Sequence, residues 1–313
     1  MVVDGRGSSA DRRHHGLIRR LLVAVLLITV AACADSGTKP ATAPSSSSAA
    51  APTSSRPFTV TRRDVTFEDA SRGRTLPTLL LVPDGSGPFP LVEFSHGVTG
   101  SGPAYLGFLE PIAAAGYVVA APTFPLTSGP NGWSHLADYT NQPADVYFVV
   151  DSVLKLAADP GDELHGKVTA DELALAGHSL GAMTTIGAVY NSCCAQPRVK
   201  AAISLSGVES TFGDGTFDNR PPVPLLLGHG QKDTTIVSSG SDTLFQRATG
   251  PAAYVQYPDA THTSIFTGEN GKLLDQATIA WLDKWLRSDN TEFDALPAAV
   301  TASRVATLKT KNL

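Results

Sequence analysis

The order of apolar runs along the chain constrains its fold more than any other feature. Helical spacing of apolar residues at 104–117, 144–159 and 273–286 alternates with short segments of strand-like composition. Those segments cover residues 58–67, 76–84, 90–97, 118–124, 173–177, 199–207, 223–230 and 252–258. Buried strands interleaved with helices indicate a mostly parallel sheet covered on both faces. The sequence therefore predicts one doubly wound α/β domain over residues 58–288, followed by a C-terminal tail at 289–313 that forms a short helix or stays loose.

The first 32 residues have the pattern of a secretory signal. Arg12, Arg13, Arg19 and Arg20 form a basic region before an apolar run at 21–32, which is shorter than the roughly 20 residues of a comfortable membrane span. The run ends in the sequence VAAC at 30–33, which resembles a bacterial lipobox, where the cysteine is acylated and becomes the new N-terminus. We predict a lipoprotein signal peptide at 1–32 and lipidation of Cys33. The alternative is an ordinary signal peptide that happens to contain a cysteine.

A tether is predicted to follow Cys33. Residues 34–57 consist almost entirely of Ala, Ser, Thr, Pro and Gly. Such a segment cannot bury enough apolar surface to offset the entropy of ordering it. Lipid anchor, tether and globular body together predict a protein of the cell envelope, exported and held at the outer face of the membrane.

The charge of the mature chain excludes one class of partner. Loss of residues 1–32 removes five of the 24 basic and two of the 29 acidic residues, which leaves 19 and 27 and a net charge of −8. No cluster of Lys or Arg remains in the body, so nucleic acid is not an expected partner.

The two remaining cysteines, Cys193 and Cys194, are neighbours in the sequence. A bond between neighbours is strained, because adjacent Cα atoms lie about 3.8 Å apart and disulfides prefer roughly 4.4–6.8 Å. Export nevertheless favours oxidation. The sequence leaves open whether the pair forms a disulfide or two buried thiols. No Cys-x-x-Cys motif or His/Cys cluster predicts a metal site.

One serine of the body occupies a position with a specific chemical meaning. The pentapeptide GHSLG at 177–181, with Ser179 at its centre, follows a predicted strand and opens a predicted helix. A G-x-S-x-G segment in this context is typical of a nucleophile elbow, a turn that tolerates only small residues two positions either side of the serine. The turn exposes the hydroxyl, and the helix N-terminus stabilises developing negative charge. We predict that Ser179 is a nucleophile.

A serine nucleophile needs a base and an acid. His262 follows the last predicted strand, where a loop can carry it over Ser179, whereas His178 is too close in sequence to reach the hydroxyl easily. Asp233 lies a few residues after a strand end and is the predicted acid. The rival acid is Glu209, which follows the preceding strand.

The oxyanion formed by such an attack needs preorganised amide donors. One predicted donor is the backbone N–H of Leu180, at the start of the helix. The other is the N–H of Val98, in the loop after the strand at 90–97, where Gly97 lets the backbone approach the substrate.

Four segments together, FSHGVTGS, GHSLGAM, GHGQKDTTI and DATHTSIF, resemble the α/β-hydrolase superfamily over about residues 58–286. Within it, the chain is similar to the group of dienelactone hydrolases, platelet-activating-factor acetylhydrolases and cutinase-like polyester hydrolases. The resemblance implies ester hydrolysis through an acyl-enzyme, no cofactor and a triad of Ser179, Asp233 and His262 in the chain order of that superfamily. Dienelactone hydrolases use a cysteine nucleophile, which disfavours their substrate here.

Two loops bear on the substrate. The insert between the strands at 199–207 and 223–230 is short, so no large lid is expected. The longest irregular stretch near the strand ends, residues 125–142, contains Trp133 and Tyr139. These side chains either line a substrate pocket or pack the loop onto the sheet.

The sequence thus predicts an exported, membrane-anchored serine carboxylesterase that acts on lipophilic or short-chain esters. A phospholipid or acetyl-ester deacylase of the acetylhydrolase type is an alternative. A non-catalytic surface lipoprotein on a hydrolase scaffold is a second one, from a different functional class. The oligomeric state is not predicted.

Overall fold

The computed structural model describes residues 57–313, and positions 1–56 lie outside the described part of the chain. The predictions of a signal peptide at 1–32, of lipidation at Cys33 and of a tether fall almost wholly on positions outside that part. Within residues 57–313, no helix combines the length and the apolar character that crossing a membrane requires.

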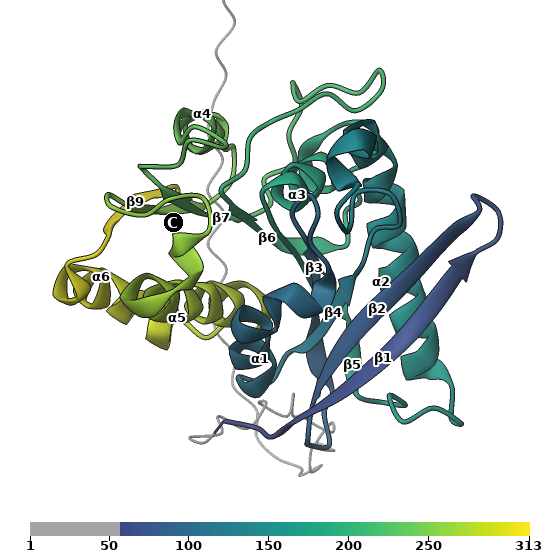
Figure 1. The fold of residues 1–313 in the computed structure, drawn as a ribbon. Helices are drawn as coiled ribbons and strands as arrows, with labels where there is room; N and C mark the ends of the chain where they lie inside the picture. Colours follow the sequence, from purple (N-terminus) through teal and green to yellow (C-terminus); the bar gives the residue numbers. More distant parts are fainter. Residues whose placement is uncertain (1–56) are drawn as a thin grey trace, which may run out of the picture. The chain divides into compact units, whose positions relative to one another are not determined.

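Within the described residues, nine strands form a single sheet in the order β1-β2-β4-β3-β5-β6-β7-β8-β9 (Figure 1). The six strands from β4 to β8 in this order run parallel to their neighbours, whereas β1, β2 and β9 pair in antiparallel fashion at the two edges. The prediction of a mostly parallel sheet is confirmed. The strands are β1 (Val60–Asp69), β2 (Arg74–Pro83), β3 (Phe89–Ser95), β4 (Val118–Pro122), β5 (Val168–His178), β6 (Val199–Leu205), β7 (Leu225–Gly230), β8 (Ala252–Tyr257) and β9 (Thr307–Lys311).

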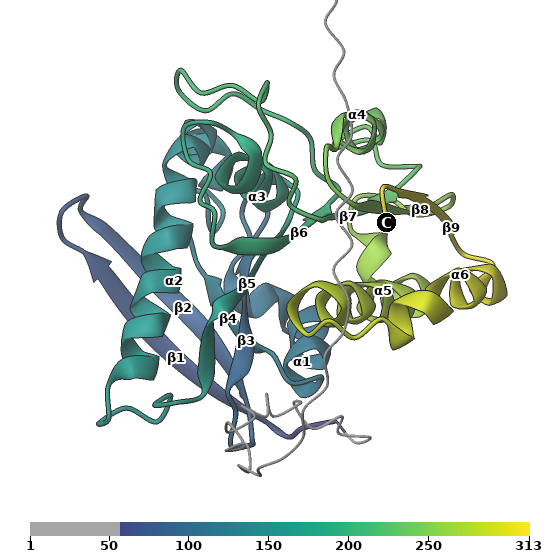
Figure 2. The same ribbon diagram turned by 180° about the vertical axis from the view of Figure 1, so that it is seen from behind.

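Helices cover both faces of this sheet (Figures 1 and 2). One core cluster joins the sheet to α1, α5 and α6, and a second joins its other face to α2, α3 and α4. The central strands are buried along almost their whole length, which explains their continuous apolar sequence. The helices are α1 (Leu106–Ala114), α2 (Gln142–Ala158), α3 (Leu180–Tyr190), α4 (Ser239–Arg247), α5 (Gly268–Leu286) and α6 (Thr291–Ser303).

The segment 289–313, predicted as a tail, contains α6 and β9, and both pack onto the domain. Phe293, Leu296 and Val300 of α6 are buried in the core cluster that also holds Trp281 of α5. Strand β9 pairs with β8 along its whole length and so adds a ninth strand to the sheet. Helix α4 was not predicted, because its sequence is polar and buries only Ser241 and Leu244.

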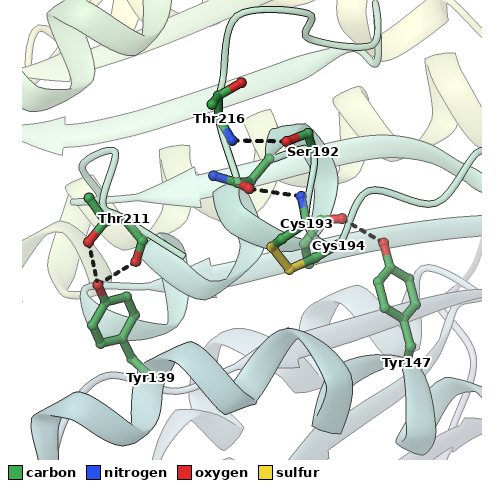
Figure 3. Close-up of a disulfide and its surroundings, with 9 residues drawn as sticks. Tyr139, Tyr147, Ser192, Cys193, Cys194, Thr211 and Thr216 are labelled. Carbon is green, nitrogen blue, oxygen red and sulfur yellow. Dashed lines mark hydrogen bonds between the residues drawn. A yellow bond between two sulfur atoms is a disulfide. The ribbon is translucent and has the colours of Figure 1, made fainter. Parts of the chain in front are cut away.

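Cys193 and Cys194 form a disulfide after the end of α3 (Figure 3). Cys193 is exposed, so the alternative of two buried thiols is wrong. The turn that carries the bond is held to the loop 206–224, because the backbone N–H of Ser192 donates to the carbonyl of Thr216 at 2.9 Å. The N–H of Thr216 in turn donates to Ser192 Oγ at 2.9 Å. The disulfide therefore sits where α3 meets the loop that follows β6.

The segment between β4 and α2, named the loop 123–141, ends in the 3₁₀ helix η2 (Gly132–Asn141) and is held by a buried charge network. The guanidinium of Arg74, at the start of β2, donates two hydrogen bonds to Asp138 at 2.7 and 2.9 Å. It also pairs with Asp145 of α2, a residue with no exposed surface. This network ties the β1–β2 hairpin to the end of the loop.

Candidate active site

Ser179 lies in a tight turn between β5 and α3, with φ of 56° and ψ of −121°. Close packing on either side explains the two glycines of the pentapeptide. A Cβ atom on Gly177 would collide with the carbonyl oxygen of Gly181, and one on Gly181 would collide with the carbonyl oxygen of Ser95. The positive φ of a non-glycine residue is strained and persists only when the surrounding structure imposes it. The geometry is that of the predicted nucleophile elbow.

His262 brings its imidazole to this serine from the loop after β8. Its Nε2 atom lies 2.8 Å from Ser179 Oγ, and its Nδ1 atom lies 2.6 Å from Asp233 Oδ2. His262 is 83 positions from Ser179 and 29 positions from Asp233 in the sequence. The fold brings these three residues, predicted as a triad, into one hydrogen-bonded chain. They come from loops at the carboxyl ends of β5, β7 and β8, as expected for a ligand site in a parallel sheet.

Asp233 is buried and surrounded by donors. Its Oδ1 atom accepts the backbone N–H groups of Thr235 at 2.8 Å and Ile236 at 3.0 Å. Burial by itself raises the pKa of the Asp233 carboxyl, but the hydrogen bonds from His262 and these two amides outweigh it and hold the pKa below its usual value. An ionised carboxylate at Nδ1 fixes the proton of His262 on that atom and leaves Nε2 free to accept the proton of Ser179.

His229 is a second partner of Asp233 that the sequence analysis did not identify. Its Nε2 atom lies 3.1 Å from Asp233 Oδ2, and its Nδ1 atom lies 2.7 Å from Ser241 Oγ. Burial lowers the pKa of His229, which therefore stays neutral. The sequence feature that could have indicated this contact is the position of His229 at the end of β7, four residues before Asp233.

Glu209, the rival acid, is engaged elsewhere. Its carboxylate pairs with Arg220 and, at 2.7 Å, with Arg247. These two guanidinium groups hold it on the loop 206–224, and the described structure gives it no contact with His262. The geometry therefore favours Asp233 as the partner of the histidine.

The loop after β3, which carries Val98, lies against the serine elbow. A Cβ atom on Gly97 would lie 3.1 Å from Ser179 Cβ, so this backbone already touches the elbow. The N–H of Gly97 donates to Tyr105 Oη at 3.2 Å and that of Thr99 donates to the carbonyl of Thr127 at 2.7 Å. The N–H of Val98, between them, donates to no acceptor within residues 57–313. This pattern suits the predicted oxyanion donor.

Leu180 supplies the second predicted donor. It is the first residue of α3, so its N–H has no acceptor one turn earlier in the helix. The positive end of the helix dipole lies at the same point.

His96 holds the loop after β3 through two hydrogen bonds. Its Nδ1 atom lies 2.7 Å from the carbonyl of Gly97, and its Nε2 atom accepts the N–H of Phe124 at 2.9 Å. Burial lowers the pKa of His96 to about 4, so the ring is neutral and carries its proton on Nδ1. It joins the loop after β3 to the loop after β4.

Exposed apolar side chains gather on the loops around the site. Within residues 57–313, four of the five large exposed apolar residues belong to the loop 123–141 or to the loop that carries Asp233. They are Leu126, Trp133, Leu136 and Val237. Trp133 is 57% exposed, so it does not pack the loop onto the sheet.

Tyr139 has the packing role that the sequence left open. Its hydroxyl donates to the carbonyl of Thr211 (Figure 3). Its ring stands edge-on to Phe212, with centroids 5.1 Å apart. Tyr139 thus holds the loop 123–141 against the loop 206–224.

Taken together, the arrangement can perform acyl transfer. A hydroxyl lies in hydrogen-bond contact with an imidazole that a buried carboxylate orients, which is the arrangement that activates a serine for attack on a carbonyl.

Comparison with protein families gives one match. A family model described as Chlorophyllase matches residues 54–223, which is more than half of the chain. The matched part contains the loop after β3 and the Ser179 elbow and ends before Asp233 and His262. No curated protein matches the chain.

Proposed function

The chain belongs to the chlorophyllase family, a family of ester hydrolases in the α/β-hydrolase superfamily, and we propose that it is a serine esterase that works through an acyl-enzyme. The observation that carries the proposal is the continuous hydrogen-bonded chain from Ser179 Oγ through His262 to Asp233. The first contact activates the nucleophile and the second orients the base.

In this mechanism Ser179 Oγ attacks the carbonyl carbon of the ester while His262 Nε2 takes the hydroxyl proton. Asp233 stabilises the imidazolium that forms, and the N–H groups of Val98 and Leu180 hold the oxyanion. Collapse of the tetrahedral intermediate expels the alcohol, which receives the proton from His262. A water molecule, activated by the same histidine, then hydrolyses the acyl-enzyme and restores Ser179.

The proposed substrates are lipophilic or short-chain esters. The exposed apolar side chains of Leu126, Trp133, Leu136 and Val237, on the loop 123–141 and on the loop that carries Asp233, support this class. The family name points to chlorophyll, which belongs in the substrate panel beside p-nitrophenyl esters and an acetylated glycerophospholipid.

The proposed location is the outer face of the cell membrane. Support comes from the lipobox-like sequence at 30–33 and the Ala/Ser/Pro-rich segment after it. The substitution Cys33→Ala is expected to move the protein from the membrane fraction to the soluble fraction of cells that export it. Unchanged partitioning would rule out the anchor.

The function is tested with a fluorophosphonate probe and a p-nitrophenyl acyl chain-length series. The wild-type protein is expected to be labelled and to turn the esters over, and Ser179→Ala is expected to lose labelling and about 10⁴-fold or more in kcat. The matched control is Ser152→Ala on α2, whose hydroxyl only donates to the carbonyl of Phe148. Absence of labelling and turnover in the wild type would leave the non-catalytic surface lipoprotein. Turnover that survives in Ser179→Ala would place the nucleophile elsewhere.

A further inference from the structure

A second hydrogen-bonded chain runs behind the candidate triad. The backbone N–H of Gly97 donates to Tyr105 Oη at 3.2 Å, and Tyr105 Oη lies 2.8 Å from His178 Nδ1. On the other side of the ring, His178 Nε2 lies 3.0 Å from the backbone carbonyl oxygen of His262. Three segments that are distant in sequence therefore meet at one imidazole.

The direction of each bond in this chain follows from the partners. The carbonyl of His262 can only accept, so Nε2 of His178 carries a proton. Burial lowers the pKa of His178 to about 3, which keeps the ring neutral, so its Nδ1 atom has no proton and accepts. Tyr105 then donates its hydroxyl proton to His178 and accepts the N–H of Gly97. Every donor in the chain has one acceptor.

Aromatic packing holds the same imidazole from the side. The His178 ring lies 4.9 Å from the ring of Phe266 and 4.7 Å from the ring of His262, measured between centroids. Tyr105 also packs edge-on to Phe266 at 5.6 Å. Only 3% of His178 is exposed, so water does not compete readily for its two nitrogen atoms.

We propose that His178 and Tyr105 are positioning residues that couple the oxyanion loop, the serine elbow and the backbone of His262 into one rigid unit. Their effect on the proposed esterase reaction, on which this role rests, is indirect. Tyr105 accepts the N–H of Gly97 and so fixes the backbone next to the amide of Val98. His178 is covalently joined to Ser179 and holds the carbonyl of the residue that supplies the base.

Such a unit acts on the transition state more than on substrate binding. The oxyanion and the imidazolium exist only during the reaction, and both depend on the relative position of these three segments. A misplacement of about 1 Å at a reacting group can cost roughly 100-fold in rate. Loss of the unit therefore lowers kcat and kcat/KM together and leaves KM nearly unchanged.

The test is Tyr105→Phe, which removes one hydroxyl and keeps the ring that packs against Phe266. We expect kcat and kcat/KM for p-nitrophenyl butyrate to fall together by about 10-fold or more, with KM within twofold of the wild type. The matched control is Tyr117→Phe, which removes the hydroxyl of a fully buried tyrosine whose partner is Asp283, at 2.6 Å. This control is expected to lower the melting temperature and leave kcat within twofold.

Two histidine variants extend the test. The amide of His178→Gln can both donate and accept, so it is expected to retain more of kcat than His178→Leu, which can do neither. Wild-type turnover with kcat of Tyr105→Phe within twofold would overturn the positioning role alone. The positioning role alone would also be overturned if the loss of activity in Tyr105→Phe equalled the loss of folded protein. Absence of turnover by the wild type would overturn the proposed function together with this role.

Discussion

Four donors surround the carboxylate of Asp233, and their number explains why a nearly buried acid stays ionised. Two of them are imidazoles, those of His262 and His229, and two are backbone amides of the turn that follows β7. Hydrogen bonds to the charged form favour it over the neutral form, which here outweighs the effect of burial. The negative charge of Asp233 therefore lies at Nδ1 of His262, the nitrogen that does not face Ser179.

The substitution Asp233→Asn is expected to lower kcat about 10³- to 10⁴-fold at pH 7. The amide of Asn would donate to Nδ1 of His262, so the ring proton would move to Nε2. A protonated Nε2 can no longer accept the proton of Ser179. Steady-state kinetics with a p-nitrophenyl ester measures the loss. The matched control is Asp259→Asn, at an exposed carboxylate that pairs with Lys232 on the surface. A loss below tenfold in Asp233→Asn would contradict the assigned role.

At the scale of single residues, the sequence could predict the triad candidates and could not predict their supports. Ser179, Asp233 and His262 each follow a strand with a clear apolar pattern, so their common edge of the sheet was foreseeable. Tyr105 and His178 are 73 positions apart, and no spacing rule connects a tyrosine on one loop to a histidine inside the elbow. Such a contact depends on the packed positions of whole elements.

A buried charge network holds the loop 123–141 and the start of α2 to the β1–β2 hairpin. Arg74 is nearly buried and forms ion pairs with the carboxylates of Asp138 and Asp145. Arg72 forms a further ion pair with Asp145, at 2.7 Å. Charges removed from water are tolerated only when they are paired in this way. The network joins the hairpin of β1 and β2 to the loop and to the start of α2.

We expect Arg74→Met to lower the free energy of unfolding by about 3–5 kcal/mol, because it leaves buried carboxylates without their main partner. The matched control is Arg62→Met on β1, where an exposed arginine pairs with exposed Asp64. An exposed pair of this kind contributes about 1 kcal/mol or less. Denaturant-induced unfolding of both variants measures the difference. Equal effects in the two variants would show that the buried network contributes no special stability.

At the scale of elements, the sequence predicted those that are strongly apolar and missed those whose apolar face is short. The central strands and α5 follow from their pattern, whereas α4 buries one leucine and had no such signal. In the segment after Ser288, the spacing of Phe293, Leu296 and Val300 fits one face of a helix, and this face meets the core. The pairing of β9 with β8 was not visible, because β9 is polar and lies at an edge.

For the molecule as a whole, buried ionisable groups set how stability changes with pH. Burial lowers the pKa of His96 to about 4 and that of His178 to about 3, so these two rings bind fewer protons in the folded protein than in the unfolded chain below about pH 6.5. Their contribution to stability is therefore lost as the pH falls from 6.5 through the two lowered pKa values. Burial also raises the pKa of Asp275 to about 7 and that of Glu93 well above its usual value, which acts in the opposite direction between pH 4.5 and 7.

The contribution of one histidine can be isolated with His96→Gln. Gln can accept the N–H of Phe124 and donate to the carbonyl of Gly97, so both contacts of the ring have a substitute. Between pH 6 and 4.5 the free energy of unfolding of this variant should fall less steeply than that of the wild type, by about 1.4 kcal/mol per pH unit. Urea titrations at several pH values measure the slopes. Identical slopes would show that His96 is not held neutral by the fold.

The superfamily and the α/β fold class predicted from the sequence are confirmed by the family match and by the sheet. The fold class follows from the alternation of buried strands and helices, which leaves few topologies open, whereas the superfamily was predicted from the four segments around the site residues. The subgroup within the superfamily and the ester itself depend on the loops around the site. Those loops carry little periodicity, so their sequences predict neither shape nor specificity.

The formation of an acyl-enzyme on Ser179 is tested by trapping that intermediate. The protein is mixed with p-nitrophenyl butyrate, quenched in acid within the first turnovers and examined by intact and peptide mass spectrometry. The wild type is expected to gain the mass of one butyryl group on the peptide that contains Ser179, and Ser179→Ala is expected to gain none. A wild-type protein that turns the ester over while the peptide containing Ser179 gains no acyl group would contradict the claim that Ser179 forms an acyl-enzyme.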